Sequence, residues 1–177
     1  MNPLMECVLW DYQLNIEFKR LTDISPGDII ALNSNPLVLR HMPLSDGVFD
    51  EEKCRAWVQE KDLQWEMYGY GPWAFLVDGA FAGWGGLQYE SGDADLALVL
   101  HPKYWGAGKI IYNKIINRAF FQMRLESVTI LLPPTRTRVK GVLRQGFKLE
   151  GDITIGGERF IRYRLYRGDC RSTILNV

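Results

Sequence analysis

Residues 101–109 read HPKYWGAGK and separate two segments with contrasting apolar patterns. The segment before them, residues 94–100, reads ADLALVL, an almost unbroken apolar run that is typical of a strand buried on both faces. In the segment after them, apolar side chains recur at helical spacing from Ile111 to Met123. We therefore predict a central strand, a tight glycine-containing turn and an amphipathic helix.

The turn is predicted to bind a phosphate or pyrophosphate. A strand followed by a turn and a helix presents several backbone N–H groups in a row, beside the positive end of the helix dipole. Gly106 and Gly108 allow a bulky anion to approach the backbone, and Lys103 and Lys109 add positive charge. A plain glycine-rich turn with solvated lysines is the alternative interpretation, because short motifs often match by chance.

Two well-known phosphate motifs do not fit this turn. A Walker loop needs Ser or Thr after its Gly-Lys pair, but Lys109 is followed by Ile110. A dinucleotide fingerprint needs a third glycine where Ile111 stands, and an early place in the chain. What remains is a basic residue, two spacers, a glycine, one spacer and a second glycine.

That remaining pattern resembles the acyl-CoA pyrophosphate loop of the GNAT superfamily of N-acyltransferases, with Lys103, Gly106 and Gly108 at the matching positions. The longer string at residues 101–108 resembles the branch that contains the ribosomal-protein N-terminal acetyltransferases, in which Pro-x-Tyr-Trp-Gly-x-Gly is common. Residues 142–147, VLRQGF, resemble a second family segment, Leu-x-Lys-x-Gly-Phe. The resemblance covers about residues 14–166.

Length and composition set the outer bounds. The 177 residues predict a single domain, 1–177, with an N-terminal arm at 1–12 and a tail at 168–177. The formal charge of zero gives no reason to expect a nucleic acid partner. Three cysteines without a C-x-x-C pair and only two histidines argue against a metal site or a histidine triad. Without an apolar run of ~20 residues or a secretory signal, we expect a cytoplasmic monomer or homodimer with no membrane partner.

The order of the predicted elements also matches the GNAT fold. We predict strands over residues 13–21, 73–77, 80–89, 94–100, 127–132, 147–155 and 159–166. We predict helices over residues 26–34 and 51–68, from the glycine turn to Met123, and over 135–145 with Thr135 as the N-cap, whereas 36–46 should be a loop. The expected class is mixed α/β (α+β): a mostly antiparallel twisted sheet of six to seven strands flanked by about four helices.

The resemblance implies that acetyl-CoA is the co-substrate. In the family, the end of the central strand separates from its neighbour at a bulge, and its backbone binds the pantetheine arm and donates to the oxyanion. The turn then holds the pyrophosphate. The binding residues implied in this way are Leu98, Val99, Leu100, Lys103, Trp105, Gly106, Ala107, Gly108 and Lys109.

Amide formation also requires a neutral amine. Amines have reference pKa values of ~8 to ~10, so a base or a water chain must remove a proton. The family often places a carboxylate early on the central strand, and Asp95 occupies that position, with Asp93 on the same face. Glu90, at the end of the preceding strand, is the second catalytic candidate. Solvated charge at the start of a strand is the alternative interpretation of both aspartates.

The group that would protonate the departing thiolate is absent. GNAT enzymes often carry an Asn at the start of the second late helix and a Ser or Tyr further along it. Thr135, Arg138 and Val142 stand at those positions. A CoA thiol with a pKa of ~8.5 can leave as a thiolate, which Arg138 could stabilise. Arg138 could instead bind the adenosine 3′-phosphate together with Arg136 and Lys140, or belong to a solvated helix face.

The candidate substrate-binding residues are Tyr68, Tyr70, Trp84 and Gln88. The resemblance implies an acceptor cleft beside the second helix and the middle strands, where aromatic rings can bind an apolar or cationic group. Gln88 and Glu90 could attract an ammonium group. The alternative is that the aromatic residues form core, as they do at most regularly spaced positions.

Three functions stay open from the sequence. The first is an N-acetyltransferase in which a primary amine, of a protein N-terminus or a small molecule, attacks the thioester of acetyl-CoA directly. The second is a non-catalytic acyl-CoA-binding or sensor module on the same fold, which the absent acid favours. The third is a nucleotide-phosphate-binding protein of another class.

Overall fold

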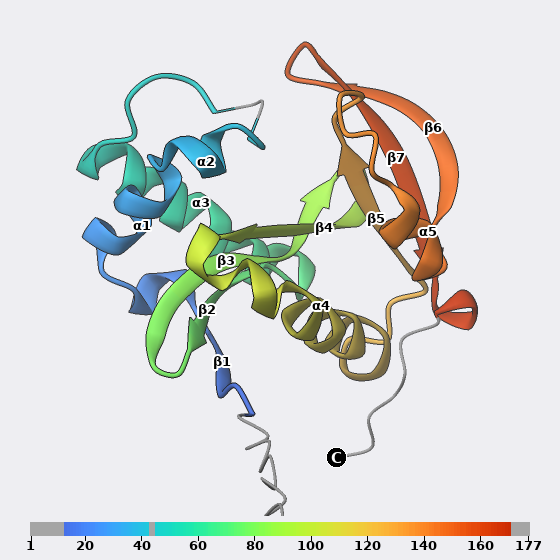
Figure 1. Ribbon diagram of the computed structural model, residues 1–177, viewed down its shortest axis with the longest axis horizontal. Coiled ribbons are helices and arrows are strands. Elements are labelled where there is room, and N and C mark those ends of the chain that lie inside the picture. Colours follow the sequence, from blue (N-terminus) through green and yellow to red (C-terminus); the bar gives the residue numbers. More distant parts are fainter. Residues whose placement is uncertain (1–12, 43–44, 171–177) are drawn as a thin grey trace, which may run out of the picture.

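The computed structural model of the chain describes residues 13–42 and 45–170. These residues form a seven-stranded sheet in the order β1-β2-β3-β4-β5-β7-β6 (Figure 1). The strands are β1 (Ile16–Lys19), β2 (Pro72–Val77), β3 (Ala80–Glu90), β4 (Asp93–Leu100), β5 (Ser127–Leu132), β6 (Lys148–Ile155) and β7 (Glu158–Tyr166). Neighbours run antiparallel except β4 and β5, which are parallel. The predicted mixed fold with a mostly antiparallel sheet is confirmed, whereas the predicted arm at 1–12 and most of the predicted tail lie outside the described residues.

The helices of the described residues are α1 (Pro26–Asn33), α2 (Pro36–Leu39), α3 (Glu51–Tyr68), α4 (Gly108–Asn117) and α5 (Lys140–Arg144). The prediction of a loop over 36–46 is wrong, because α2 occupies its first residues. The Asn35 side chain caps α2 by accepting from the Leu37 N–H at 2.9 Å, and Pro36 takes the first helical position. After α4, the chain continues to Gln122 as one turn of π-helix. None of the described helices has both the length and the apolar character needed to span a bilayer.

The second late helix is much shorter than predicted. The sequence predicts a helix from Thr135, but α5 begins only at Lys140, and Thr135 lies in an exposed turn. Thr135, Thr137 and Val139 are β-branched and have low helix propensity, and cationic side chains alternate with them. The prediction that Thr135 caps this helix is therefore wrong.

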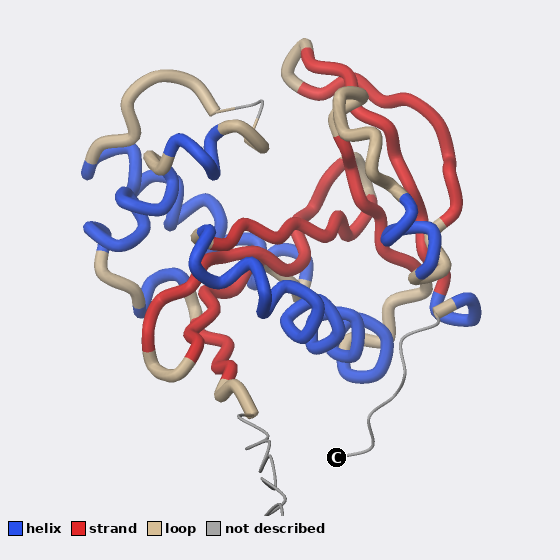
Figure 2. The backbone as a smooth tube through the Cα atoms, viewed as in Figure 1, coloured by secondary structure: helices blue, strands red, loops and turns tan. Residues whose placement is uncertain are grey.

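Helices cover both faces of the sheet (Figure 1, Figure 2). On one face, Ile111 and Ile115 of α4 belong to the larger core cluster, together with Phe75 of β2 and Leu96 of β4. On the other face, side chains of α1, α2 and α3 pack around Trp84 of β3. We call this second side the α3 face.

The pairing between β4 and β5 stops almost as soon as it starts. Between β4 and β5, only Asp95 and Thr129 are paired, whereas β4 pairs with β3 along its whole length. The two parallel strands therefore part beyond Asp95, toward the glycine turn. No register shift interrupts the β3–β4 ladder, so the bulge implied by the family resemblance is not present there.

Burial along β4 follows from this parting. Ala97, Leu98 and Val99 are only half-buried, although the sequence predicts a strand buried on both faces. Without a β5 partner on that side, these residues lose part of their cover and their backbone keeps one edge unpaired. The result is an open strand edge that leads to residues 102–108.

A close approach at Gly83 gives a first prediction. A Cβ atom at Gly83 would lie 2.1 Å from the Val99 carbonyl oxygen, whereas one at Gly106 would meet no atom within 4 Å. We expect Gly83→Ala to lower the free energy of unfolding by about 2 kcal/mol, the scale of overpacking in a dense interior. Urea denaturation measures the change. Gly106→Ala is the matched control, and equal stability of the two variants would contradict the close packing of β3 on β4.

Candidate active site

The glycine turn has a defined backbone structure. Residues Pro102–Ala107 form a 3-10 helix that leads directly into α4 at Gly108. The His101 side chain starts it, because Nδ1 accepts from the Lys103 N–H at 3.1 Å. The predicted sequence of central strand, turn and helix is confirmed. The Lys103 and Gly108 N–H groups already have partners within the turn, so other N–H groups would have to bind a phosphate.

The fold itself does not require glycine at Gly106 or Gly108. Neither residue has a positive φ, and a Cβ at Gly108 would make only van der Waals contacts with Leu98 and Leu100. Gly106 is exposed and faces open space. The absence of side chains therefore keeps room beside this backbone, as the close approach of a large anion demands.

Charged and aromatic groups surround the turn. Lys103 and Lys109 are exposed, and neither forms an ion pair with any carboxylate of the described residues. Trp105 is exposed, but its Nε1 donates to the Leu100 carbonyl oxygen at 3.0 Å. That oxygen is therefore occupied, while Ala107 is buried beneath the turn.

Asp95 lies at the point where β4 and β5 part. It is buried, with only 8% of its surface exposed, and its Oδ1 accepts from the Thr129 hydroxyl at 3.0 Å. Burial raises the pKa of Asp95 to about 8, with further upward contributions from the charges of Glu90 and Asp93, while the Thr129 hydrogen bond opposes the shift. This carboxyl group can therefore exchange a proton in the range where an amine titrates.

The two other carboxylates predicted nearby differ from Asp95. Glu90 lies opposite Asp93 in the β3–β4 ladder, and its Oε1 accepts from the Ser91 hydroxyl at 3.3 Å. Asp93 is not a solvated charge, because both of its oxygens accept from the Arg164 guanidinium at 2.8 Å. These contacts and the charge of Arg164 lower the pKa of Asp93.

Gln88 faces Asp95 across the β3–β4 ladder and is tied to α3. Its Oε1 accepts from the Lys61 ammonium group at 2.5 Å. Burial lowers the pKa of Lys61, and the charges of Glu60 and Glu90 oppose that shift. The structure thus places a lysine amine beside the predicted substrate-binding residue, which the sequence gave no reason to expect.

The aromatic candidates lie in two different environments. Tyr68 stacks on Tyr89 with 4.1 Å between ring centroids and an interplanar angle of 6°, and Tyr89 is 41% exposed. Tyr70 is buried beside Tyr68. Trp84 is a core residue of the α3 face, and its Nε1 donates to the Asn33 side chain at 2.9 Å. Of these candidates, the Tyr68–Tyr89 stack is the one with an open surface.

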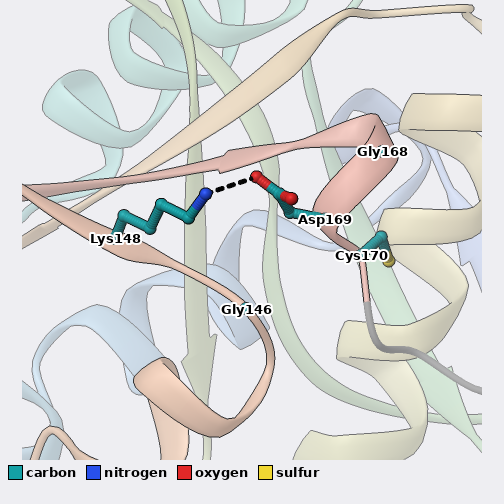
Figure 3. A pocket seen from close by; sticks show the side chains of 5 residues that line it. All are labelled: Gly146, Lys148, Gly168, Asp169 and Cys170. Atoms are coloured by element: carbon teal, nitrogen blue, oxygen red, sulfur yellow. Dashed lines mark hydrogen bonds and ion pairs between the residues drawn. The ribbon is translucent and has the colours of Figure 1, made fainter.

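At the positions where the family carries the acid that protonates the departing thiolate, this chain has no such acid. Thr135 and Arg138 are exposed, and Val142 is half-buried in α5. A cavity of about 340 Å³ lies nearby in the chain, at the start of β6, but it is lined by Gly146, Lys148, Gly168, Asp169 and Cys170 (Figure 3). Lys148 and Asp169 form an ion pair of 2.8 Å beside it. None of the predicted site residues lines this cavity.

Three of the residues in this region escape sequence reasoning. Thr129 and Arg164 reach Asp95 and Asp93 only through the pairing of the sheet, and Lys61 reaches Gln88 only through the packing of α3. No local motif marks any of them. The one available signal is that Arg162 and Arg164 stand two residues apart in β7, which places both side chains on the same face of the sheet.

A sheet that parts beside a glycine turn and a helix start is the architecture of an acyl-CoA-binding fold, and comparison with known proteins agrees. Residues 17–145 match the family model described as an acetyltransferase (GNAT) domain. The chain therefore belongs to this family and is an acyl-CoA-dependent N-acyltransferase, which uses acetyl-CoA and acts on an amine acceptor.

Solved structures support the same fold. An acetyltransferase from Agrobacterium tumefaciens aligns with a TM-score of 0.69 at 15% identity, covering 92% of this chain and 99% of that one. A GNAT-family acetyltransferase from Bacillus anthracis aligns with a TM-score of 0.63 at 20% identity, covering 86% and 94%. A candidate ribosomal-protein-serine acetyltransferase from Vibrio cholerae aligns with a TM-score of 0.62 at 17% identity, covering 85% and 93%.

Proposed function

We propose that this chain transfers the acetyl group of acetyl-CoA to a primary amine by direct attack, with Asp95 as the base. The observation that carries the proposal is the place of Asp95, which is buried and forms the last β4 pair before the strands part. A thioester lying along the open edge of β4 would bring its carbonyl close to this carboxyl group. The amine would then approach from the α3 face, which Asp95 shares with Gln88.

The backbone of β4 supports binding of the pantetheine arm. Leu98 and Val99 lie beyond the last β5 partner, so their β5-side edge is free for a ligand. One N–H of this edge would donate to the oxyanion that forms on attack. The Leu100 N–H remains a candidate, whereas the Leu100 carbonyl oxygen is occupied by Trp105.

The turn would hold the pyrophosphate. Gly106 and Ala107 supply the backbone N–H groups, and the missing side chain of Gly108 keeps room for the anion. Lys103 and Lys109 supply positive charge that no carboxylate of the described chain neutralises. Thr135 and Arg138, which are exposed before α5, would contact the adenosine end or the sulfur. The thiolate leaves with modest help, because its pKa of ~8.5 lies near the working pH.

The acceptor we propose is a protein N-terminus. Two observations support it: the resemblance of residues 101–108 to the ribosomal-protein branch, and the structural likeness to the Vibrio cholerae protein. The exposed Tyr68–Tyr89 stack offers an apolar surface to a side chain of the acceptor, and Glu90 could attract its ammonium group.

The binding site is tested by Gly106→Val. A Cβ at this position would meet no atom within 4 Å, so the new side chain would project into the space beside the turn. We expect the affinity for CoA, measured by calorimetry, to fall about tenfold or more, while the melting temperature stays unchanged. Gly168→Val is the matched control, because a Cβ at Gly168 also meets open space but lies outside the turn. Unchanged CoA affinity in Gly106→Val would refute the assignment of the turn.

Turnover tests the proposed acceptor. Peptides with free N-termini are incubated with acetyl-CoA, and release of CoA thiol is followed with a thiol reagent. Catalytic release with these peptides supports a protein N-terminus as the acceptor, whereas release only with small amines would contradict it.

A further inference from the structure

Lys61 is a half-buried amine on the α3 face of the sheet. It belongs to α3, and its Nζ lies 2.5 Å from Gln88 Oε1 and 6.0 Å from the centroid of the Trp57 ring. The Trp57 ring packs on Trp84 with 4.8 Å between centroids. These contacts hold the amine over β3, between Gln88 and Trp84.

The stretch of β4 from 95 to 99 is the open edge described above. Gln88 pairs with Asp95, and Trp84 pairs with Val99. Directly opposed residues of an antiparallel pair have Cβ atoms about 5 Å apart, so Nζ is one strand away from the place proposed for the thioester. A lysine side chain has four rotatable bonds and can cover that distance by changing rotamer.

The surroundings of Lys61 favour a neutral nucleophile. It forms no ion pair with a carboxylate of the described residues, and its one hydrogen-bond acceptor is the uncharged amide of Gln88. The charged groups that face it are Glu60 and Glu90, and Asp95 stands behind Gln88. The pKa of Lys61 is lowered despite the two glutamates, because burial outweighs them.

We propose that Lys61 is a self-acetylation site, which takes the acetyl group from acetyl-CoA bound along β4 when no outside amine is present. The proposal rests on the acyltransfer function proposed above. The neutral amine attacks the thioester carbonyl, the N–C bond forms and the C–S bond breaks. The amine proton ends on the CoA sulfur, so the products are acetyl-lysine and CoA thiol, with no further reactant.

Acetylation would change the acceptor side of the site. It converts the Lys61 amine beside Gln88 into an amide and adds an acetyl group between Trp57 and Gln88. The added group reduces the space available to an incoming amine. Self-acetylation would therefore slow transfer to outside acceptors, and a protein lacking Lys61 would not show this decline.

The experiment uses the full chain with acetyl-CoA alone. Intact mass is followed over time, and peptide mapping locates the acetyl group. We expect one acetyl group per chain, located at Lys61, at a rate that does not change over a roughly tenfold range of protein concentration. Lys61→Arg should abolish this label. Lys53→Arg, which replaces an exposed lysine of the same helix, should leave it unchanged.

Chemical acetylation provides the second readout. At a pH of about 10.5 or higher, where exposed lysine amines are also largely neutral, acetic anhydride modifies lysines mainly by exposure. It should then label exposed lysines such as Lys53 ahead of the half-buried Lys61. Acetyl-CoA should reverse this order. Label spread over exposed lysines, a rate proportional to protein concentration, or a persistent single label in Lys61→Arg would overturn the proposal.

CoA binding, measured by thermal shift, separates the two possible failures. If the protein binds CoA and acetylates an added peptide but Lys61 stays unmodified, the self-acetylation proposal alone is wrong. If CoA does not stabilise the fold, the proposed function fails with it.

Discussion

Asp95→Asn should lower kcat for acetyl transfer by about 100-fold, the usual contribution of a positioned general base. The substitution keeps the size of the side chain and an acceptor for the Thr129 hydroxyl, but it removes the group that takes the amine proton. In the wild-type protein, kcat should rise with pH and level off above about 8, because burial holds the pKa of Asp95 there. In Asp95→Asn, this rise of kcat with pH should be absent. Initial rates at saturating acetyl-CoA, measured over pH 6 to 10, provide the test.

The same substitution should stabilise the protein at alkaline pH. The folded chain keeps Asp95 protonated up to about pH 8, whereas the unfolded chain ionises it near pH 4, so the unfolded state binds fewer protons in between. The free energy of unfolding contributed by this group is therefore greatest below about pH 4 and falls as the pH rises through about 8. Asp95→Asn removes that loss, so its stability advantage over wild type should grow with pH. A stabilised but inactive variant distinguishes a catalytic role from general damage to the fold.

Glu90 is the carboxylate against which Asp95 must be compared. Glu90→Gln should cost less activity than Asp95→Asn, because Glu90 contributes negative charge but does not lie where β4 and β5 part. Asp152→Asn removes an exposed carboxylate of β6 that pairs with Arg159, and it should leave kcat unchanged. A larger loss in Glu90→Gln than in Asp95→Asn would transfer the role of base to Glu90.

Local patterns predicted most of the architecture and less of the site. The apolar run at 94–100, the helical periodicity after it and the hairpin turns are properties of neighbouring residues, and the elements they predicted are confirmed. The helix predicted from Thr135 is wrong because the β-branched residues Thr135, Thr137 and Val139 have low helix propensity, and α5 begins only after them. Family resemblance placed Asp95, but its burial and its Thr129 partner depend on β4 meeting β5, a contact between residues 34 positions apart.

Trp84 illustrates why the candidate substrate-binding residues were harder to predict. An aromatic residue in a middle strand can face a cleft or a helix, and the sequence does not say which. Its neighbours in space, Asn33 of α1 and Trp57 of α3, decide that it is buried. Lys61 is the converse case, because a lysine on a mostly polar helix gives no sign that its amine reaches the sheet.

Arg164→Leu should lower the free energy of unfolding by about 3 kcal/mol, the largest loss of stability we predict. Arg164 lies in β7 and donates to Asp93 of β4 at 2.8 Å through both Nη atoms, to Glu150 of β6 at 2.7 and 3.1 Å, and to the Ser127 hydroxyl at 2.9 Å. Its side chain is only 14% exposed. Removal of one partner from such a network leaves the others charged and poorly solvated, which costs more than the loss of a surface pair.

Arg159→Leu is the matched control in the same strand. Arg159 pairs with Asp152, but both side chains are more than half exposed, so the pair should contribute less than about 1 kcal/mol. Arg162 does not replace Arg164, because its Nε lies 2.6 Å from a Glu150 oxygen without the alignment of a hydrogen bond. Chemical denaturation of the two leucine variants measures the difference. Equal losses of stability in the two variants would show that the Arg164 network stabilises the fold no more than the exposed Arg159–Asp152 pair does.

The pH dependence of this stability has a defined sign. Hydrogen bonds from Arg164 lower the pKa values of Asp93 and Glu150 in the folded chain. Their contribution to stability is therefore complete above the unfolded values, near pH 4, and is lost as the pH falls below them. Arg164→Leu should flatten the stability curve on this acidic side, whereas Arg159→Leu should leave it unchanged.

Loss of Arg164 should also weaken binding of acetyl-CoA, for a reason that lies in the sheet. The single Asp95–Thr129 pair joins β4 to β5, and the Arg164 network is the polar connection that joins β4 to β5, β6 and β7 beside that pair. Without it, the angle at which the two strands part is held only by the Asp95–Thr129 pair and by packing. We expect Arg164→Lys, which keeps one cation and is less destabilising, to raise the KM for acetyl-CoA with a smaller effect on kcat. An unchanged KM in a folded Arg164→Lys variant would mean that the opening between β4 and β5 is fixed by the core.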